Sequence, residues 1–275
     1  MVRGVSRKLS LTLSAPRLLP WVGPGPWALL AALWALGSVG SAALRIGAFN
    51  IQCFGDSKVS DPACGRVIAQ ILAGYDVMLV QEVRDPDLSA VTVLLEQINS
   101  VSEHEYSFVS SKPLGRDQYK EMYLYIYRKD TVSVVETYQY PDAEDAFSRD
   151  PFVVKFSAPS CGCVGDRRPL RCLLGLDRQV GHRYCNYVRA QDWAAIRLRS
   201  SEIFKWLIPD SADTTVGNSD CAYDRIVVCG ARLRRSLKPH SAAVHDFQEE
   251  FGLDQAQALS ISDHFPVEVT LKSHR

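Results

Sequence analysis

The sequence has no excess of positive charge, and this absence limits how the chain could bind nucleic acid. Its 275 residues include 31 Lys and Arg against 31 Asp and Glu. A protein that binds DNA through charge alone is expected to be strongly basic, because Lys and Arg contacts to phosphate dominate such binding. A chain with this balance that acts on phosphates must bring cations to them, so the composition points to a bound divalent metal.

The sequence also lacks an apolar run of the roughly 20 residues that a membrane-spanning helix needs. The apolar stretch Trp27–Leu36 is too short, and the segment 1–43 around it contains no acidic residue. Its basic residues are Arg3, Arg7, Lys8 and Arg17. A basic start, a short apolar stretch and small residues up to Ala43 predict a secretory signal peptide, cleaved before Leu44. We therefore expect a secreted protein without a membrane anchor, with one domain over 44–275. Because the basic leader is long, the alternative is that some of the protein stays inside the cell.

The cysteines do not follow the usual zinc-binding spacings. Cys161 and Cys163 are separated by eight residues from the next cysteine, Cys172, and this spacing matches none of them. All eight cysteines lie after the predicted signal peptide, so in a secreted protein they favour disulfides. The chain has no Asn-x-Ser/Thr glycosylation site and no internal repeat.

Residue patterns predict a mixed order of strands and helices. Apolar residues at helical spacing predict helices over Ala63–Leu72, Leu88–Ile98 and Ala190–Leu198, the second capped by Asp85 or Asp87. Runs rich in Val, Ile, Phe and Tyr predict strands at Arg45–Gln52, Asp76–Val83, Tyr106–Ser110, Met122–Arg128, Val132–Tyr140, Phe152–Ser157, Tyr223–Val228 and Val267–Leu271. This order predicts an α/β (α+β) sandwich rather than a doubly wound parallel sheet.

One stretch does not fit this plan. Ala158–Asn186 scatters Pro, Gly and Arg without a helical or strand period, and it contains three of the cysteines in twelve positions. A long surface loop is the simplest interpretation, but loops of this length are uncommon inside a domain. We interpret it as an aberrant segment, foreign to the rest of the domain.

Polar residues follow or precede several predicted strands. Asn50 and Glu82 come at the ends of two strands, where amide and carboxylate oxygens can hold a hard cation. The dipeptide Asp263-His264 precedes the last strand, and Asp224 stands near another. Such a set suggests acid–base chemistry beside a metal, although each residue alone could equally be a cap or a surface group.

Taken together, seven segments resemble the deoxyribonuclease I family in order and in detail: LRIGAFNIQ, LVQEVRD, PLGRDQYKEMYLYIYR, FSRDPFVVKFS, IRLRSSEIFKWLIPDSADTT, CAYDRIVV and ISDHFPVEV. The resemblance spans Leu44–Ser157 and Tyr187–Leu271. It implies a four-layer sandwich of the endonuclease/exonuclease/phosphatase type, with two facing sheets and helices outside. It also implies a monomer that hydrolyses DNA to 5′-phosphate ends with Mg²⁺ or Mn²⁺, supported by Ca²⁺.

The same resemblance implies roles for individual residues. His264 is expected to act in acid–base catalysis with Asp224 holding its other ring nitrogen, and Glu121 to orient a second catalytic histidine. The expected ligands of the metal and phosphate are Asn50, Glu82 and Asp263. The expected DNA contacts are Arg84, Tyr119 and Arg149, and the expected disulfide joins Cys185 to Cys221.

Two motifs of the family are absent. After FVVKFS the family continues into a strand ending in Leu-His-x-x-Pro, which carries the second catalytic histidine, and later into Gly-Asp-Phe-Asn; this chain contains neither. In their place stands the shorter segment 158–186, in which His182 has the surroundings of a loop residue. Loss of two central strands predicts exposed strand edges, poor folding and little activity.

Three functions are consistent with the sequence. The first is that of a DNA endonuclease, and the second is that of a catalytically inactive isoform or mis-spliced product that retains weak DNA binding. A third alternative is another enzyme of the same superfamily, such as a phosphoinositide phosphatase or a sphingomyelinase, although the segments PLGRDQYKE and CAYDRIVV favour the nuclease.

Overall fold

A computed structural model of the chain describes residues 43–143, 147, 149–158, 173–174 and 197–272. These residues belong to one compact unit, Ser41–Arg275. Of the predicted signal peptide 1–43 only Ala43 is described, and of the segment 158–186 only Ala158, Leu173 and Leu174 are. Cys185 lies outside the described residues, as does the predicted helix Ala190–Leu198 except for its last two residues. Among the helices that are described, none has the length and apolar character needed to cross a membrane.

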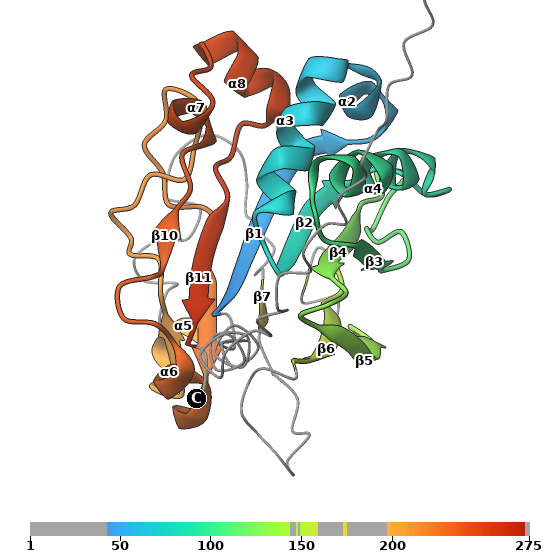
Figure 1. Cartoon of the computed structure of the whole chain (residues 1–275). Coiled ribbons are helices and arrows are strands. Elements are labelled where there is room, and N and C mark those ends of the chain that lie inside the picture. Colours follow the sequence, from blue (N-terminus) through green and yellow to red (C-terminus); the bar gives the residue numbers. More distant parts are fainter. Residues whose placement is uncertain (1–42, 144–146, 148, 159–172, 175–196, 273–275) are drawn as a thin grey trace, which may run out of the picture. The chain divides into compact units, whose positions relative to one another are not determined.

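A six-stranded mixed sheet forms the centre of the described unit (Figure 1). Its order is β10-β11-β1-β2-β4-β3, in which β1 and β2 run parallel and the other pairs are antiparallel. The strands are β1 (Leu44–Phe54), β2 (Val77–Val83), β3 (Tyr106–Ser110), β4 (Met122–Arg128), β10 (Ala243–Val244) and β11 (Val267–Leu271). All but the short β10 are strands that the sequence predicts.

Helices cover one face of this sheet. Alternate strand residues such as Met78 and Val80 pack there against Ile68 and Leu94, because successive side chains of a strand point to opposite faces. Helix α3 (Pro62–Ala73) begins where the Asp61 carboxylate accepts backbone N–H groups of the first turn. The other helices on this face are α4 (Ser89–Val101), α7 (Phe247–Glu250) and α8 (Gln255–Ile261).

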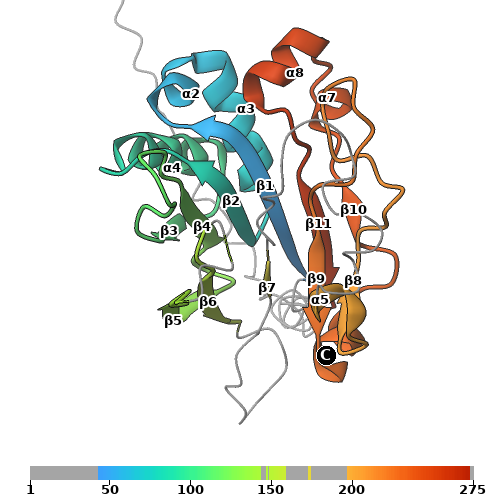
Figure 2. The same cartoon turned by 180° about the vertical axis from the view of Figure 1, so that it is seen from behind.

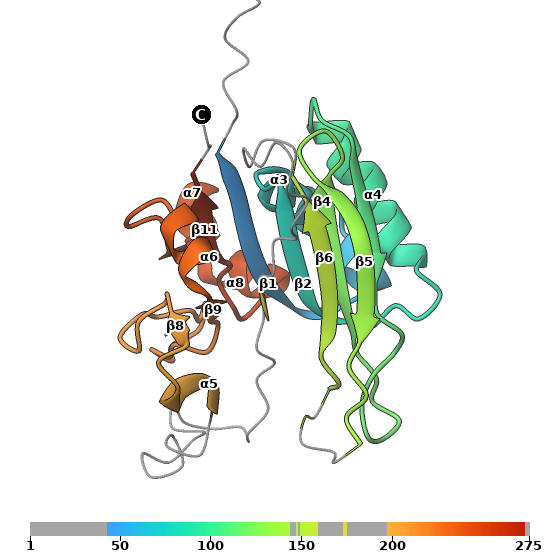
Figure 3. The ribbon, with the colours of Figure 1, turned by 90° about the horizontal axis from the view of Figure 1, so that it is seen from below.

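The opposite face of the sheet is also buried, but by strands. Val77 and Leu79 pack there with Phe156 of one small sheet and Ile226 of another. The first small sheet pairs β5 (Ser133–Gln139) with β6 (Phe152–Ser157). The second has the order β7-β9-β8, formed by β7 (Leu173–Leu174), β9 (Ile226–Cys229) and β8 (Phe204–Trp206). A helix layer, a central sheet and a second β layer confirm the predicted α/β sandwich (Figures 2 and 3).

The second β layer is divided. Among the described strands β6 pairs with β5 alone, and no ladder joins β6 to the β7-β9-β8 sheet. The family's two missing strands are expected at this place in the chain, between β6 and β9. Residues 159–172 and 175–196, between β6 and β9, lie outside the described part of the chain, so the loss of central strands stays a prediction.

Two local predictions were wrong in detail. The strand expected at Tyr223–Val228 begins only at Ile226, because the N–H groups of Tyr223 and Asp224 donate to the Thr214 hydroxyl instead of to a neighbouring strand. The N-cap of α4 is Leu88, although Asp85 still accepts from the Val91 N–H of its first turn. The short elements α2 (Asp56–Ser60) and α6 (Ala231–Ser236) have no clear signal in the sequence, whereas α5 (Arg197–Ser200) overlaps the end of the predicted helix Ala190–Leu198.

Candidate active site

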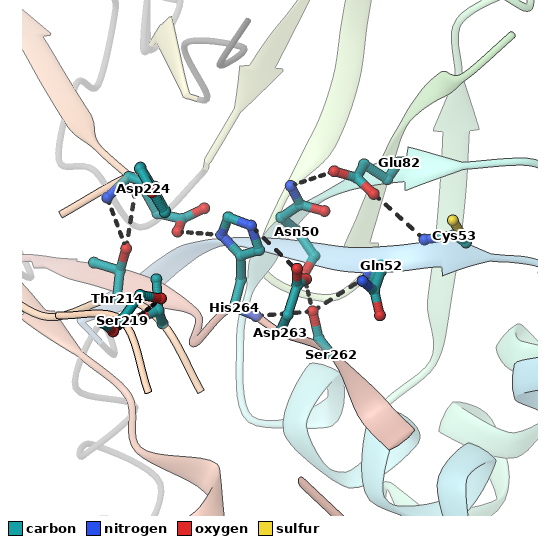
Figure 4. A network of polar contacts seen from close by, with 12 residues as sticks. Asn50, Gln52, Cys53, Glu82, Thr214, Ser219, Asp224, Ser262, Asp263 and His264 are labelled. Carbon is teal, nitrogen blue, oxygen red and sulfur yellow. Dashed lines mark hydrogen bonds and ion pairs between the residues drawn. The ribbon is translucent and has the colours of Figure 1, made fainter. Parts of the chain in front are cut away.

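The ends of the parallel strands β1 and β2 bring Asn50 and Glu82 together (Figure 4). The Asn50 amide donates to Glu82 Oε1 at 2.9 Å, and the Cys53 backbone N–H lies 3.4 Å from Glu82 Oε2. Glu82 has a left-handed backbone with φ of 59° where the β2 ladder is irregular, a conformation that costs a non-glycine residue about 1 kcal/mol. Local strain at Glu82 thus accompanies the turn of its carboxylate toward β1.

A histidine–aspartate pair lies beside these residues. His264 Nδ1 is 2.7 Å from Asp224 Oδ2; His264 is buried and Asp224 is largely buried. The other ring nitrogen of His264 is 3.8 Å from Asp263 Oδ1, whose side chain is 43% exposed. A carboxylate on Nδ1 fixes the tautomer and the orientation of the ring, which leaves Nε2 to exchange protons. The pair is therefore arranged for general acid–base chemistry.

Two buried hydroxyls hold the parts of the site in place, and sequence reasoning missed both. Ser262 Oγ donates to the Asn50 carbonyl at 2.6 Å and accepts from the N–H groups of Gln52 and His264. Thr214 Oγ1 accepts from the Asp224 N–H at 3.1 Å. Ser262 links the end of β1 to the His264 segment, and Thr214 braces Asp224. A small hydroxyl residue directly before Asp263-His264 was the only available signal for Ser262.

Glu121 lies in a small pocket with another predicted site residue, Arg149. The Arg149 guanidinium is 3.3 Å from Glu121 Oε1, and Glu82 also lines the pocket. Burial raises the pKa of the Glu121 carboxyl; the Arg149 charge opposes this rise and the Glu82 charge adds to it. Arg149 is only 7% exposed. The structure thus pairs Glu121, expected to orient a histidine, with a buried arginine.

The two other predicted DNA contacts form an exposed cluster at the same end of the sheet. The Arg84 guanidinium lies 4.2 Å from the centre of the Tyr119 ring, and Tyr119 is 38% exposed. Cys53, a free and exposed cysteine, has its sulfur 3.6 Å from the Tyr119 hydroxyl. Burial is the main cause that raises the pKa of Tyr119, so its hydroxyl stays neutral at physiological pH. A cation stacked on an aromatic ring is suited to a phosphate backbone beside a sugar or base.

The described residues offer a sparse set of metal ligands. Asn50 Oδ1 is buried and accepts no hydrogen bond, and the Glu82 carboxylate lies beside it. Within the described part of the chain no group of three or more His, Cys, Asp or Glu could hold a metal. Two oxygen donors suit Mg²⁺, which keeps several of its waters in proteins, better than Ca²⁺, which takes six to eight oxygen ligands.

The structure therefore brings the predicted residues into two groups. Asn50, Glu82, Asp263, His264 and Asp224 form one polar network around the end of β1 (Figure 4). The other group is Glu121, Arg149, Tyr119 and Arg84. Cys221 is disulfide-bonded, and its predicted partner Cys185 lies outside the described residues.

Comparisons with known proteins point in one direction. The model of the endonuclease/exonuclease/phosphatase family matches residues 47–198. Deoxyribonuclease-1-like 2 of Homo sapiens is 68% identical over 297 residues, which cover 91% of this chain and 99% of that protein. Deoxyribonuclease-1 of Gallus gallus is 47% identical over 264 residues, covering 85% of this chain and 94% of that protein. The alignment with the human protein is longer than this 275-residue chain, so that protein has residues without a counterpart here.

Solved structures show the same fold at much lower sequence identity. The crystal structure of humanized D. rerio TDP2 superposes with a TM-score of 0.53 and 15% identity, over 84% of this chain and 99% of that chain. Identity this low supports the architecture and says nothing of the substrate.

Proposed function

The chain belongs to the deoxyribonuclease I family, within the endonuclease/exonuclease/phosphatase family, and from this premise we propose that it is a divalent-metal-dependent endonuclease of DNA whose active site lacks the Leu-His-x-x-Pro and Gly-Asp-Phe-Asn motifs. The observation that carries the proposal is the His264–Asp224 pair beside Asn50 and Glu82. The products are 5′-phosphate ends, and the rate is far below that of relatives with a complete site.

The described residues supply one acid–base group. Water attack on a phosphodiester needs a base for the water, an acid or a metal for the leaving oxygen, and positive charge near the phosphoryl oxygens. His264 Nε2 takes or gives a proton at one of these oxygens, while Asp224 stabilises the protonated ring. Arg84 and Tyr119 hold the DNA backbone from the exposed side.

Asn50 Oδ1 and the Glu82 carboxylate would hold the proposed metal. The support for this placement is a buried amide oxygen without a hydrogen-bond partner next to a carboxylate. Bound Mg²⁺ or Mn²⁺ would supply positive charge to the phosphoryl oxygens. The Asp263 carboxylate lies beside His264 Nε2 and restrains the imidazole ring on the side of the proposed metal.

The missing motifs are the reason for the low rate. Glu121 contacts Arg149 where the family resemblance implies a catalytic histidine, and Leu-His-x-x-Pro and Gly-Asp-Phe-Asn occur nowhere in the chain. Loss of one acid–base group typically lowers a rate by about 10²- to 10⁴-fold. A complete loss of catalysis with retained DNA binding is the second candidate, favoured by the exposed Arg84–Tyr119 stack.

Plasmid nicking tests the proposal. The purified chain is incubated with supercoiled DNA and Mg²⁺, beside its H264A variant and beside a version in which the two missing motifs replace the segment 158–186. We expect slow nicking that H264A abolishes, and nicking at least about 100-fold faster in the restored version. Nicking by H264A equal to that of the unaltered chain would refute the role of His264. Equal rates with and without the motifs would refute the proposal that their absence limits the rate.

We also propose that the chain is secreted after cleavage before Leu44. The support is the basic, acid-free segment 1–43 with its short apolar stretch. Mass spectrometry of protein recovered from the culture medium should show Leu44 as the first residue. Recovery only from cell lysate, with Met1 intact, would show that the leader fails as a signal.

A further inference from the structure

The nearly neutral composition conceals a local concentration of positive charge around α6. Between Asp224 and Asp246 the chain contains no acidic residue. Its five Lys and Arg residues there are Arg225, Arg232, Arg234, Arg235 and Lys238. Two of these have structural roles, because Arg225 pairs with Asp210 at 3.1 Å and Arg234 donates to the Glu202 carbonyl.

The last described residue of the chain adds to this concentration. The Lys272 N–H donates to the Ser236 carbonyl at 2.7 Å, and its ammonium donates to the Arg235 carbonyl at 3.0 Å. The Lys238 N–H donates to Thr270 in the neighbouring strand. These bonds bring the segment after α6 against the end of β11, so Arg235, Lys238 and Lys272 are neighbours.

Four exposed cations result, and we call Arg232, Arg235, Lys238 and Lys272 the α6 basic surface. Helix α6 has no fully buried residue; Leu233 packs against the core, while Arg232 and Arg235 are exposed. Among the ion pairs of the described residues none involves Arg235, Lys238 or Lys272. Glu202 is an exposed acid at the edge of the surface, where its carbonyl meets Arg234.

This surface lies at the opposite end of β11 from His264. His264 precedes β11, whereas Leu271 at its far end forms a bridge with Leu237 directly after α6 (Figure 1). At about 3.3 Å per strand residue, roughly 20 Å separates the two places. The α6 basic surface therefore cannot contact the phosphate that lies at His264.

We propose that the α6 basic surface is a second contact site for the DNA backbone, which holds a duplex away from the candidate active site. The proposal rests on the proposed function for its ligand, DNA. Each phosphate that a Lys or Arg neutralises releases counterions, so the logarithm of affinity falls with the logarithm of salt by about 0.9 per phosphate contact. Contacts of this kind position DNA without reading its sequence.

Salt dependence of DNA binding tests this. Anisotropy of a fluorescent duplex is measured with the full chain in EDTA, which prevents cleavage, over a series of NaCl concentrations. We expect the slope to be shallower by about 2 in the double variant R235Q/K238Q. The matched control R66Q/K129Q removes two exposed cations from other elements, Arg66 on α3 and Lys129 after β4, and should keep the original slope.

Two results would overturn the proposal. One is an unchanged slope in R235Q/K238Q; the other is unchanged DNA binding with lost retention on heparin, which would assign the surface to a sulfated polysaccharide. Failure of the proposed function is seen separately, as absence of Mg²⁺-dependent nicking by the unaltered chain, and leaves the salt slope readable.

Discussion

Replacing Ser262, the residue directly after α8, by alanine should cost more stability than the same change at Ser260 within that helix. Ser262 is fully buried, and its hydroxyl serves the Asn50 carbonyl and the N–H groups of Gln52 and His264. Alanine leaves these three backbone groups without their partner, and each unsatisfied buried group costs about 1–3 kcal/mol. We expect a loss of about 3 kcal/mol or more, a large share of the roughly 5–15 kcal/mol by which domains are stable.

Urea unfolding measures this loss. For a slope of about 1–3 kcal/mol per molar urea, the midpoint should fall by at least about 1 M. The control is S260A, two residues earlier, because the exposed Ser260 hydroxyl only donates to the Gln257 carbonyl of its own helix. Its effect should stay within about 0.5 kcal/mol. A midpoint for S262A equal to that of S260A would refute the idea that Ser262 joins β1 to the His264 segment.

Three further changes test the site. D224N should keep the fold but lower nicking by about 10²- to 10⁴-fold, because an amide on His264 Nδ1 cannot stabilise the protonated ring; a rate within twofold of the parent would contradict this. E121Q should gain stability relative to the parent as pH rises from 4 to 7. The raised pKa of Glu121 means that the folded parent favours the protonated carboxyl, so this group's contribution to the parent's stability is fully present below the unfolded pKa and is lost as Glu121 ionises. Urea midpoints at both pH values measure the difference, and a parent that gains stability relative to E121Q over this range would reverse the sign. Y119A should weaken DNA binding in anisotropy by several fold, since it removes the ring under Arg84, whereas Y138A on exposed β5 should not.

The sequence predicted the central sheet well because its strands have a simple physical pattern. Strands buried on both faces, such as β2, are nearly continuous apolar runs, and α3 has its apolar residues at helical spacing after an Asp cap. The short elements α6 and β8 were not predictable, because three to six residues carry no period and their form depends on neighbours far away in the chain.

The candidate site likewise contains residues that could be predicted from the sequence and residues that could not. Asn50, Glu82 and the Asp263-His264 pair could be found as polar residues at strand ends, and the structure brings them into one network. The pairing of Glu121 with Arg149 could not be found, because the two residues are distant in sequence and meet only through the packing of their loops. Ser262 and Thr214 were missed for a related reason: a buried hydroxyl that holds backbone groups looks like any surface serine or threonine in the sequence.

Within the described part of the chain β6 pairs with β5 alone, so its other edge offers a row of backbone donors and acceptors to a segment with a matching pattern. In the terms of protein fragment complementation, the described unit is the larger fragment, and a peptide carrying Leu-His-x-x-Pro would be the smaller one. Such a peptide would add to β6 by β-augmentation and bring a histidine toward Glu121 at the same time. Recovery of nicking activity by the added peptide would then rise with the peptide concentration and saturate, as binding does.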